Sequence, residues 1–165
     1  MSADVRVYLP ATLPLLRGFL DERQVGPVGA PVFAVTPMLR EMHLGDSEEL
    51  EYLAQVRAAR ACLRLLREDP QAPSRRVVLA LEAPPDALTE ADHAQPGSVR
   101  LAAELDWAHV AAGLVDGLDV AQVVRAAVDA LADADAGDDD PRFLLDEVES
   151  HELGWWAAQE LPDLF

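Results

Sequence analysis

A run of five apolar residues, Val-Val-Leu-Ala-Leu at positions 77–81, constrains the fold of this chain more than any other feature. The run has no polar position and begins with two β-branched residues, which is typical of a central strand buried on both faces of a sheet. The sequence therefore predicts a sheet with residues 77–81 near its centre.

A long helix is predicted immediately before this strand, over residues 47–69. Asp46 is placed to cap its first turn, and Glu49 stands at the third helical position, as in a capping box. The Asp69-Pro70 pair ends the helix, because the residue before a proline disfavours helical geometry. The acidic residues Glu48 and Glu51 are favourable near the start of the helix, because that end of the helix dipole is positive.

The remaining pattern predicts an α/β (α+β) domain over residues 1–165. We expect a mixed sheet of about four to five strands covered by helices, with the long central helix and a C-terminal helix. The predicted strands are 5–9, 31–35, 77–81, 99–105 and 111–115. The predicted helices are 12–20, 38–44, 47–69, 120–131 and 141–161, with loops at 25–31 and 86–97 and an acidic linker at 132–140.

The formal net charge of −17 lies entirely in the C-terminal half. Residues 1–79 hold ten Arg and ten acidic residues, whereas residues 80–165 hold three Arg and twenty acidic residues. Such a surface repels phosphate backbones and anionic lipids, so we expect neither direct nucleic-acid backbone binding nor membrane binding. The start of the chain lacks a secretory signal pattern, no apolar run is long enough to span a bilayer, and the single cysteine, Cys62, excludes an intramolecular disulfide. We therefore expect a cytoplasmic protein.

No motif for nucleotide, metal or nucleophile chemistry is present. A P-loop is impossible because the chain contains no Lys, and no G-x-S-x-G or G-x-G-x-x-G sequence occurs. His151-Glu152 begins like a zinc-binding H-E-x-x-H motif, but Trp155 stands where the second His is required. The acidic run near residue 135 lacks the ligands of a calcium loop. We expect no cofactor and no metal.

Glu147 and His151 form the candidate catalytic pair. On a helix over residues 141–161 they stand at i and i+4 within the apolar arc, where their side chains can meet. A carboxylate beside an imidazole could act as a general acid and base or as two metal ligands. The same pair could equally be a partly buried ion pair that only holds the helix in register.

Two further features suggest partner binding. Four arginines project within one arc of the long helix, where they could receive an acidic partner, a phosphorylated ligand or the acidic half of the same or a neighbouring molecule, or could simply be solvated. These are Arg57, Arg60, Arg64 and Arg67. On a helix, Trp155 would face the core and Trp156 would lie at the edge of the polar face, as a partner anchor or as the rim of the core.

Three stretches give the chain a family resemblance. They are residues 5–12 (VRVYLPAT), residues 33–37 (FAVTP), and the acidic run at 136–140 leading to residues 151–160 (HELGWWAAQE). Together they resemble a family of uncharacterised actinobacterial proteins, a domain of unknown function. The absence of Lys, Asn and Ile is consistent with a gene from a high-GC genome. The resemblance implies that the final segment belongs to the family's pattern, and it implies no catalytic residue.

The sequence leaves the function unknown, with three hypotheses. The first is a non-enzymatic protein-interaction or regulatory module with a polarised acidic surface, which binds a protein partner or itself. The alternative is a small hydrolase or metal-dependent enzyme that uses Glu147 and His151, and the third is an acidic mimic of nucleic acid. The enzyme hypothesis requires a water-accessible cavity in which Glu147 and His151 converge with other polar groups.

Overall fold

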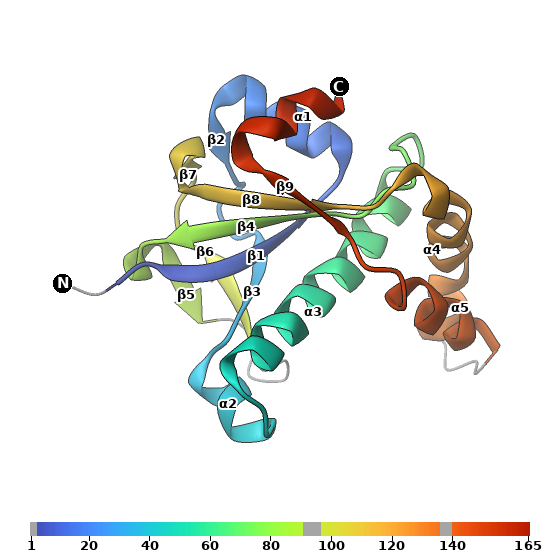
Figure 1. Cartoon of the computed structure of the whole chain (residues 1–165), viewed down its shortest axis with the longest axis horizontal. Coiled ribbons are helices and arrows are strands. Elements are labelled where there is room, and N and C mark those ends of the chain that lie inside the picture. Colours follow the sequence, from blue (N-terminus) through green and yellow to red (C-terminus); the bar gives the residue numbers. More distant parts are fainter. Residues whose placement is uncertain (1–2, 91–96, 136–139) are drawn as a thin grey trace.

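The main sheet of this computed structural model has seven strands in the order β5-β6-β3-β1-β4-β8-β9 (Figure 1). The structure describes residues 3–90, 97–135 and 140–165. The strands of the main sheet are β1 Val5–Ala11, β3 Pro31–Ala34, β4 Val77–Ala83, β5 Leu88–Glu90, β6 Ser98–Leu101, β8 Val110–Val115 and β9 Gly154–Ala157. A second, two-stranded sheet pairs β2 Gln24–Val25 with β7 Leu105–Asp106.

Five α-helices and four short 3-10 helices complete the described part of the chain. The α-helices are α1 Leu13–Glu22, α2 Pro37–Met42, α3 Ser47–Glu68, α4 Ala121–Asp135 and α5 Asp140–Glu149. The 3-10 helices are η1 Pro85–Ala87, η2 Trp107–His109, η3 Leu118–Val120 and η4 Ala158–Leu164. The α/β (α+β) class and the long helix are thus as predicted. The sheet is larger than the four to five strands expected, and every strand pair described is antiparallel rather than mixed.

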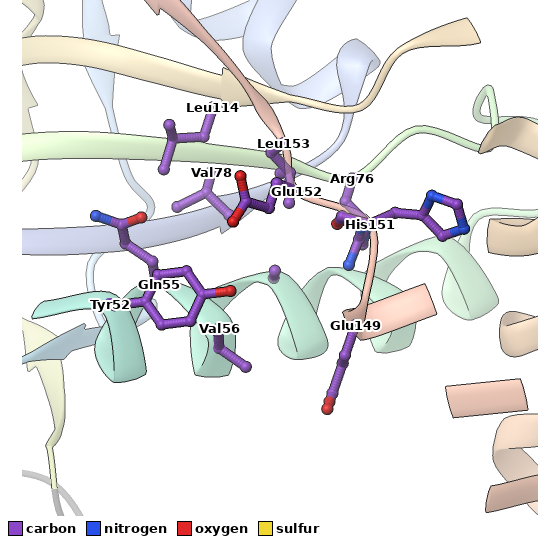
Figure 2. Close-up of a pocket in the computed structure, with 11 residues that line it drawn as sticks. Tyr52, Gln55, Val56, Arg76, Val78, Leu114, Glu149, His151, Glu152 and Leu153 are labelled. Carbon is purple, nitrogen blue, oxygen red and sulfur yellow. Dashed lines mark hydrogen bonds between the residues drawn. The ribbon is translucent and has the colours of Figure 1, made fainter. Parts of the chain in front are cut away.

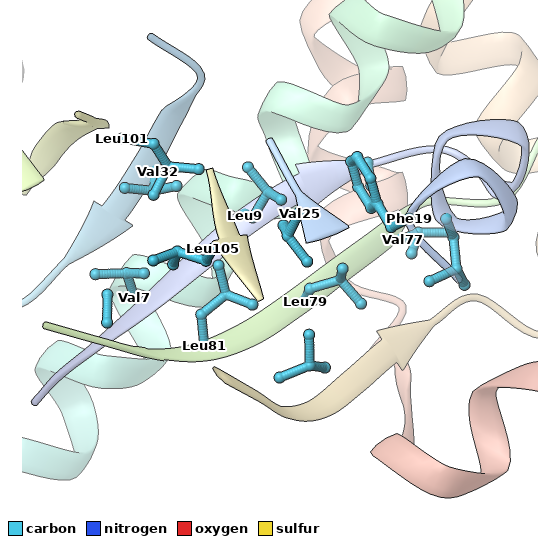
Figure 3. Packing of buried hydrophobic residues seen from close by; sticks show 14 of the residues in the cluster. Val7, Leu9, Phe19, Val25, Val32, Val77, Leu79, Leu81, Leu101 and Leu105 are labelled. Carbon is cyan, nitrogen blue, oxygen red and sulfur yellow. The ribbon is translucent and has the colours of Figure 1, made fainter. Parts of the chain in front are cut away.

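Strand β4 lies at the centre of the sheet, between β1 and β8, and is buried on both faces as its apolar run predicts. Leu79 and Leu81 enter the larger core, which α1, β2, β7 and η4 cover (Figure 3). Val78 and Ala80 point to the opposite face and pack against α3. Because side chains alternate along a strand, a sheet covered on both faces needs apolar residues at every position.

The long helix α3 is formed by the signals expected from the sequence. The Asp46 carboxylate accepts a hydrogen bond from the Glu49 backbone N–H at 2.9 Å, and the Glu49 carboxylate accepts from the Asp46 N–H at 3.3 Å. Both halves of the predicted capping box are therefore present. At its C-terminal end α3 packs with α4 and α5 around a third apolar cluster, which contains Leu66 and Val148.

The predicted C-terminal helix over residues 141–161 is wrong beyond Glu149. The chain leaves α5 in a turn at Ser150, whose hydroxyl donates to the Glu147 carbonyl at 2.6 Å. Residues 154–157 then form β9 along β8, and η4 follows. The apolar spacing predicts a helix here, but the Trp-Trp pair has high β-propensity and Gly154 has low helix propensity.

The linker predicted at 132–140 overlaps the helices on either side of it. Helix α4 continues through Asp135 and α5 begins at Asp140. The rest of the predicted linker, residues 136–139, lies outside the described residues. None of the helices that the structure describes is long and apolar enough to cross a membrane.

Candidate functional site

A cavity of about 260 Å³ opens between α3, the sheet and the connector that joins α5 to β9 (Figure 2). Helix α3 supplies one wall, β4 and β8 supply the floor, and the connector, residues 150–153, supplies the rim. The lining residues are Tyr52, Gln55, Val56, Ala59, Arg76, Val78, Leu114, Glu149, His151, Glu152 and Leu153. Five of these eleven residues are apolar, and the charged residues other than Arg76 stand at the connector or directly before it.

The deepest charged group at the cavity is Arg76, which is 1% exposed and stands directly before β4. Its Nε and Nη2 donate to the two carboxylate oxygens of Asp116 at 2.8 and 2.9 Å, and its backbone N–H donates to the same carboxylate at 2.8 Å. Asp116 is fully buried. The two charges compensate each other, as buried ion pairs must if they are to be tolerated.

Arg76 also positions the connector. Its Nη2 donates to the His151 carbonyl at 2.8 Å, across 75 residues of sequence. The chain therefore leaves α5 against the buried ion pair, which fixes where the rim of the cavity lies. No periodic or motif signal predicts this contact, because an Arg and an Asp forty residues apart belong to no local pattern.

The charged groups at the rim have different surroundings. Glu149 forms an ion pair with Arg60 of α3, with the Nη1–Oε1 distance at 3.3 Å. In the view of Figure 2 the Glu149 carboxylate and the His151 imidazole point away from Val78, whereas the Glu152 side chain points toward Val78. Within the described part of the chain, no hydrogen bond or ion pair involves the Glu152 carboxylate. Glu152 is thus the carboxylate that remains available to a ligand.

The predicted catalytic pair does not form as expected. Glu147 is exposed on the last turn of α5 and does not line the cavity, whereas His151 is half-buried and does. Because the helix ends at Glu149, the i, i+4 geometry that would have joined the two side chains is lost. Among the described residues, no group of three or more His, Cys, Asp or Glu is arranged to hold a metal ion.

The predicted arginine face of α3 is partly engaged within the molecule. Arg60 pairs with Glu149 of the acidic half, and the Arg57 Nη2 lies 3.5 Å from the Nε2 of His43. Arg64 and Arg67 are exposed, and each also has an interaction partner. Pairing with the acidic half of the same molecule is thus present for Arg60. Binding of another partner by the arginine face stays a prediction.

The two tryptophans have the opposite placement to the one expected. Trp155 is 67% exposed, and Trp156 is half-buried and packs against the main core. In β9, alternate side chains take opposite faces, so Trp155 shares a face with Leu153 and with its cross-strand partner Leu114. Both of these leucines line the cavity, so Trp155 stands on the same face of the sheet as the cavity.

Strand β9 is the last strand in the sheet order, and among the described residues it pairs only with β8. Its four residues, Gly-Trp-Trp-Ala, include no charge and no proline. Sheet edges in monomeric proteins are usually blunted by charges, proline or bulges, because an unpaired edge is a template for another strand. In Figure 1 β9, drawn in red, crosses in front of β8.

Comparison with known proteins supports the family resemblance seen in the sequence. No curated protein and no solved structure matches the chain. The family of unknown function DUF6912 matches over residues 5–165, which include β1, the cavity and β9. Since the match covers almost the whole chain, this protein belongs to the DUF6912 family of unknown function.

Proposed function

We propose that this protein is a protein-interaction module that adds an extended segment of a partner to the outer edge of β9. Among the described residues of this strand, only the Ala157 N–H donates to a side chain, the Glu160 carboxylate. The observation that carries the proposal is the exposed Trp155 on an uncharged edge strand beside an apolar cavity. In strand addition, backbone hydrogen bonds at the edge give affinity and pockets for alternate side chains give specificity. Strand β9 and the cavity together provide both elements.

The charge of the molecule selects the class of partner. The chain carries −17, and the residues around β9 include Glu152, Glu160 and Asp163 with no Arg between residues 143 and 165. A basic segment would be attracted to this edge, and an acidic one would be repelled. A second copy of this chain carries the same charge, so pairing of β9 with β9 is disfavoured. We therefore propose an extended basic segment as the occupant.

Exposed apolar residues beside the edge support the same assignment. Tyr52 of α3 is 51% exposed at the cavity wall, and Trp155 is 67% exposed on the sheet. Aromatic residues of this kind dominate the binding energy of protein interfaces, commonly with about 2 kcal/mol or more for each truncation. Loss of 2 kcal/mol corresponds to an affinity about thirtyfold weaker.

The experiment is selection of ten-residue peptides from a random display library on the full chain, followed by measurement of their affinity. We expect the selected peptides to alternate apolar and basic residues, and Trp155→Ala to weaken their binding about thirtyfold or more. Phe143→Ala is the matched control, because Phe143 is 71% exposed but lies on α5 outside the cavity lining. N-methylation of the peptide backbone should also weaken binding, because it removes strand donors.

Three outcomes would overturn the proposal. The first is that no peptide is enriched, and the second is that Trp155→Ala and Phe143→Ala behave alike. The third is a concentration-dependent dimer in sedimentation that Trp155→Ala abolishes, which would assign the edge to a second copy of the chain.

A further inference from the structure

The balance of charge at the cavity favours a cation. Arg76 is neutralised by Asp116, and Glu149 is neutralised by Arg60, so these four groups contribute no net charge. Among the residues that line the cavity, the carboxylate of Glu152 is then the one without an ion-pair partner.

The neutral polar groups of the cavity are also suited to a cation. The Gln55 amide nitrogen donates to the Tyr8 hydroxyl at 3.3 Å, which leaves the amide oxygen of Gln55 as an acceptor. The ring of Tyr52 is half-exposed at the cavity wall, and an aromatic face attracts a cation placed over it. A guanidinium group is planar, can donate two parallel hydrogen bonds to one carboxylate and stacks on aromatic rings.

The apolar wall is suited to an aliphatic chain. Val56, Val78 and Leu114 line the cavity below its polar rim. Its volume of about 260 Å³ is below the roughly 300–1,000 Å³ of pockets for drug-sized ligands, so the cavity suits one long side chain or a molecule of similar size. Long cationic side chains bury their methylene stems in this way and keep the charged head near water.

We infer that the cavity binds an alkylguanidinium, the side chain of an arginine in the segment that docks on β9. The guanidinium pairs with the Glu152 carboxylate and stacks on Tyr52, and the methylene stem lies against the apolar wall. The inference rests on the proposed function for the source of the arginine. A strand added beyond β9 places alternate side chains on the face that Trp155, Leu153 and the cavity share.

The test uses the full chain, a selected peptide and a free small molecule. We compare the peptide with a version in which its arginine is citrulline, a neutral group of nearly the same shape, and we also titrate n-butylguanidinium and butyrate. Glu152→Gln removes the carboxylate of the rim. Glu147→Gln is the matched control, because it makes the same charge change at an exposed glutamate outside the cavity lining.

We expect citrulline in the peptide, or Glu152→Gln in the protein, to weaken binding about tenfold, and the two changes together to cost no more than either alone. Glu147→Gln should change the affinity less than twofold. n-Butylguanidinium should bind, and butyrate should not. Equal effects of Glu152→Gln and Glu147→Gln would overturn the inference, as would equal affinity for the arginine and citrulline peptides or for n-butylguanidinium and butyrate.

The two proposals fail in distinguishable ways. If peptides bind in a manner that depends on Trp155 but not on Glu152 or the arginine, the assignment of the cavity is wrong and the proposed function stands. If n-butylguanidinium binds in a manner that depends on Glu152 but no peptide binds, the proposed function is wrong and the cavity accepts a small alkylguanidinium instead.

Discussion

Removing the Asp116 carboxylate should destabilise this protein more than removing an exposed carboxylate that also binds an arginine. Asp116→Ala leaves the Arg76 guanidinium charged, 1% exposed and without its counter-ion. It also deprives three N–H donors of their acceptor: Nε, Nη2 and the backbone N–H of Arg76. Breaking a buried ion pair by removing one partner costs about 3–5 kcal/mol. For a total stability of about 5–15 kcal/mol, this is a large share.

The assay is equilibrium unfolding in urea, followed by circular dichroism. With a urea dependence of about 2 kcal/mol per molar, the Asp116→Ala midpoint should fall by roughly 2 M. The matched control is Glu82→Ala, because the Glu82 carboxylate also accepts hydrogen bonds from an arginine, Arg6. Those two side chains are 40% and 38% exposed, and solvent screens such pairs to about 0.2–1 kcal/mol.

A double variant separates loss of the pair from loss of a counter-ion. Arg76→Met combined with Asp116→Leu removes both charges, so it should recover part of the stability lost in Asp116→Ala. Recovery should be incomplete, because the His151 carbonyl and the residue 76 backbone N–H remain without their partners. If Asp116→Ala costs no more than Glu82→Ala, burial does not make the Arg76–Asp116 pair harder to break than an exposed pair.

Two further predictions concern the core. Gly113→Ala should destabilise the protein by about 1–3 kcal/mol in urea unfolding, because the new Cβ would lie 2.5 Å from Cδ2 of the buried Leu161. The control Gly18→Ala in α1 has no atom within 4 Å of the new Cβ and should stabilise the protein by about 0.5–1 kcal/mol. Equal effects of the two substitutions would contradict this packing. Burial raises the pKa of the Cys62 thiol to about 11, so between about pH 9 and 11 the native state keeps a proton that the unfolded state releases. The free energy of unfolding should therefore fall by roughly 1 kcal/mol per pH unit as pH rises through this range. Cys62→Ala should lack this component, and parallel pH profiles of the two proteins would rule it out.

The elements that form through local interactions were predictable from the sequence. The α3 helix begins at a capping box between neighbouring residues, and Thr36 caps α2 by accepting from the Leu39 N–H at 3.2 Å just before a proline at the first helical position. The central strand β4 was predictable because its apolar run is specific to a strand covered on both faces. These signals act over a few residues, so no tertiary information is needed to identify them.

The candidate site was only partly predictable. His151 is a candidate residue in the sequence and lines the cavity, whereas Glu152 stands out in the sequence only as part of an incomplete zinc motif. Glu147 was expected beside His151 but is exposed on α5, because the helix ends at Glu149. The exposures expected for Trp155 and Trp156 were reversed for the same reason, since side chains of adjacent residues point about 100° apart on a helix and to opposite faces in a strand.

Composition and short-range pattern are enough to predict the class of the fold, the long helix, the buried central strand and the concentration of negative charge in the second half. They do not predict that residues 154–157 form an edge strand or that the connector before it rims a cavity. The physical reason is that a pairing partner and a long-range contact set the conformation there: β8 pairs with β9, and Arg76, compensated by Asp116, holds the His151 carbonyl. Such contacts join residues tens of positions apart, and no local pattern encodes them.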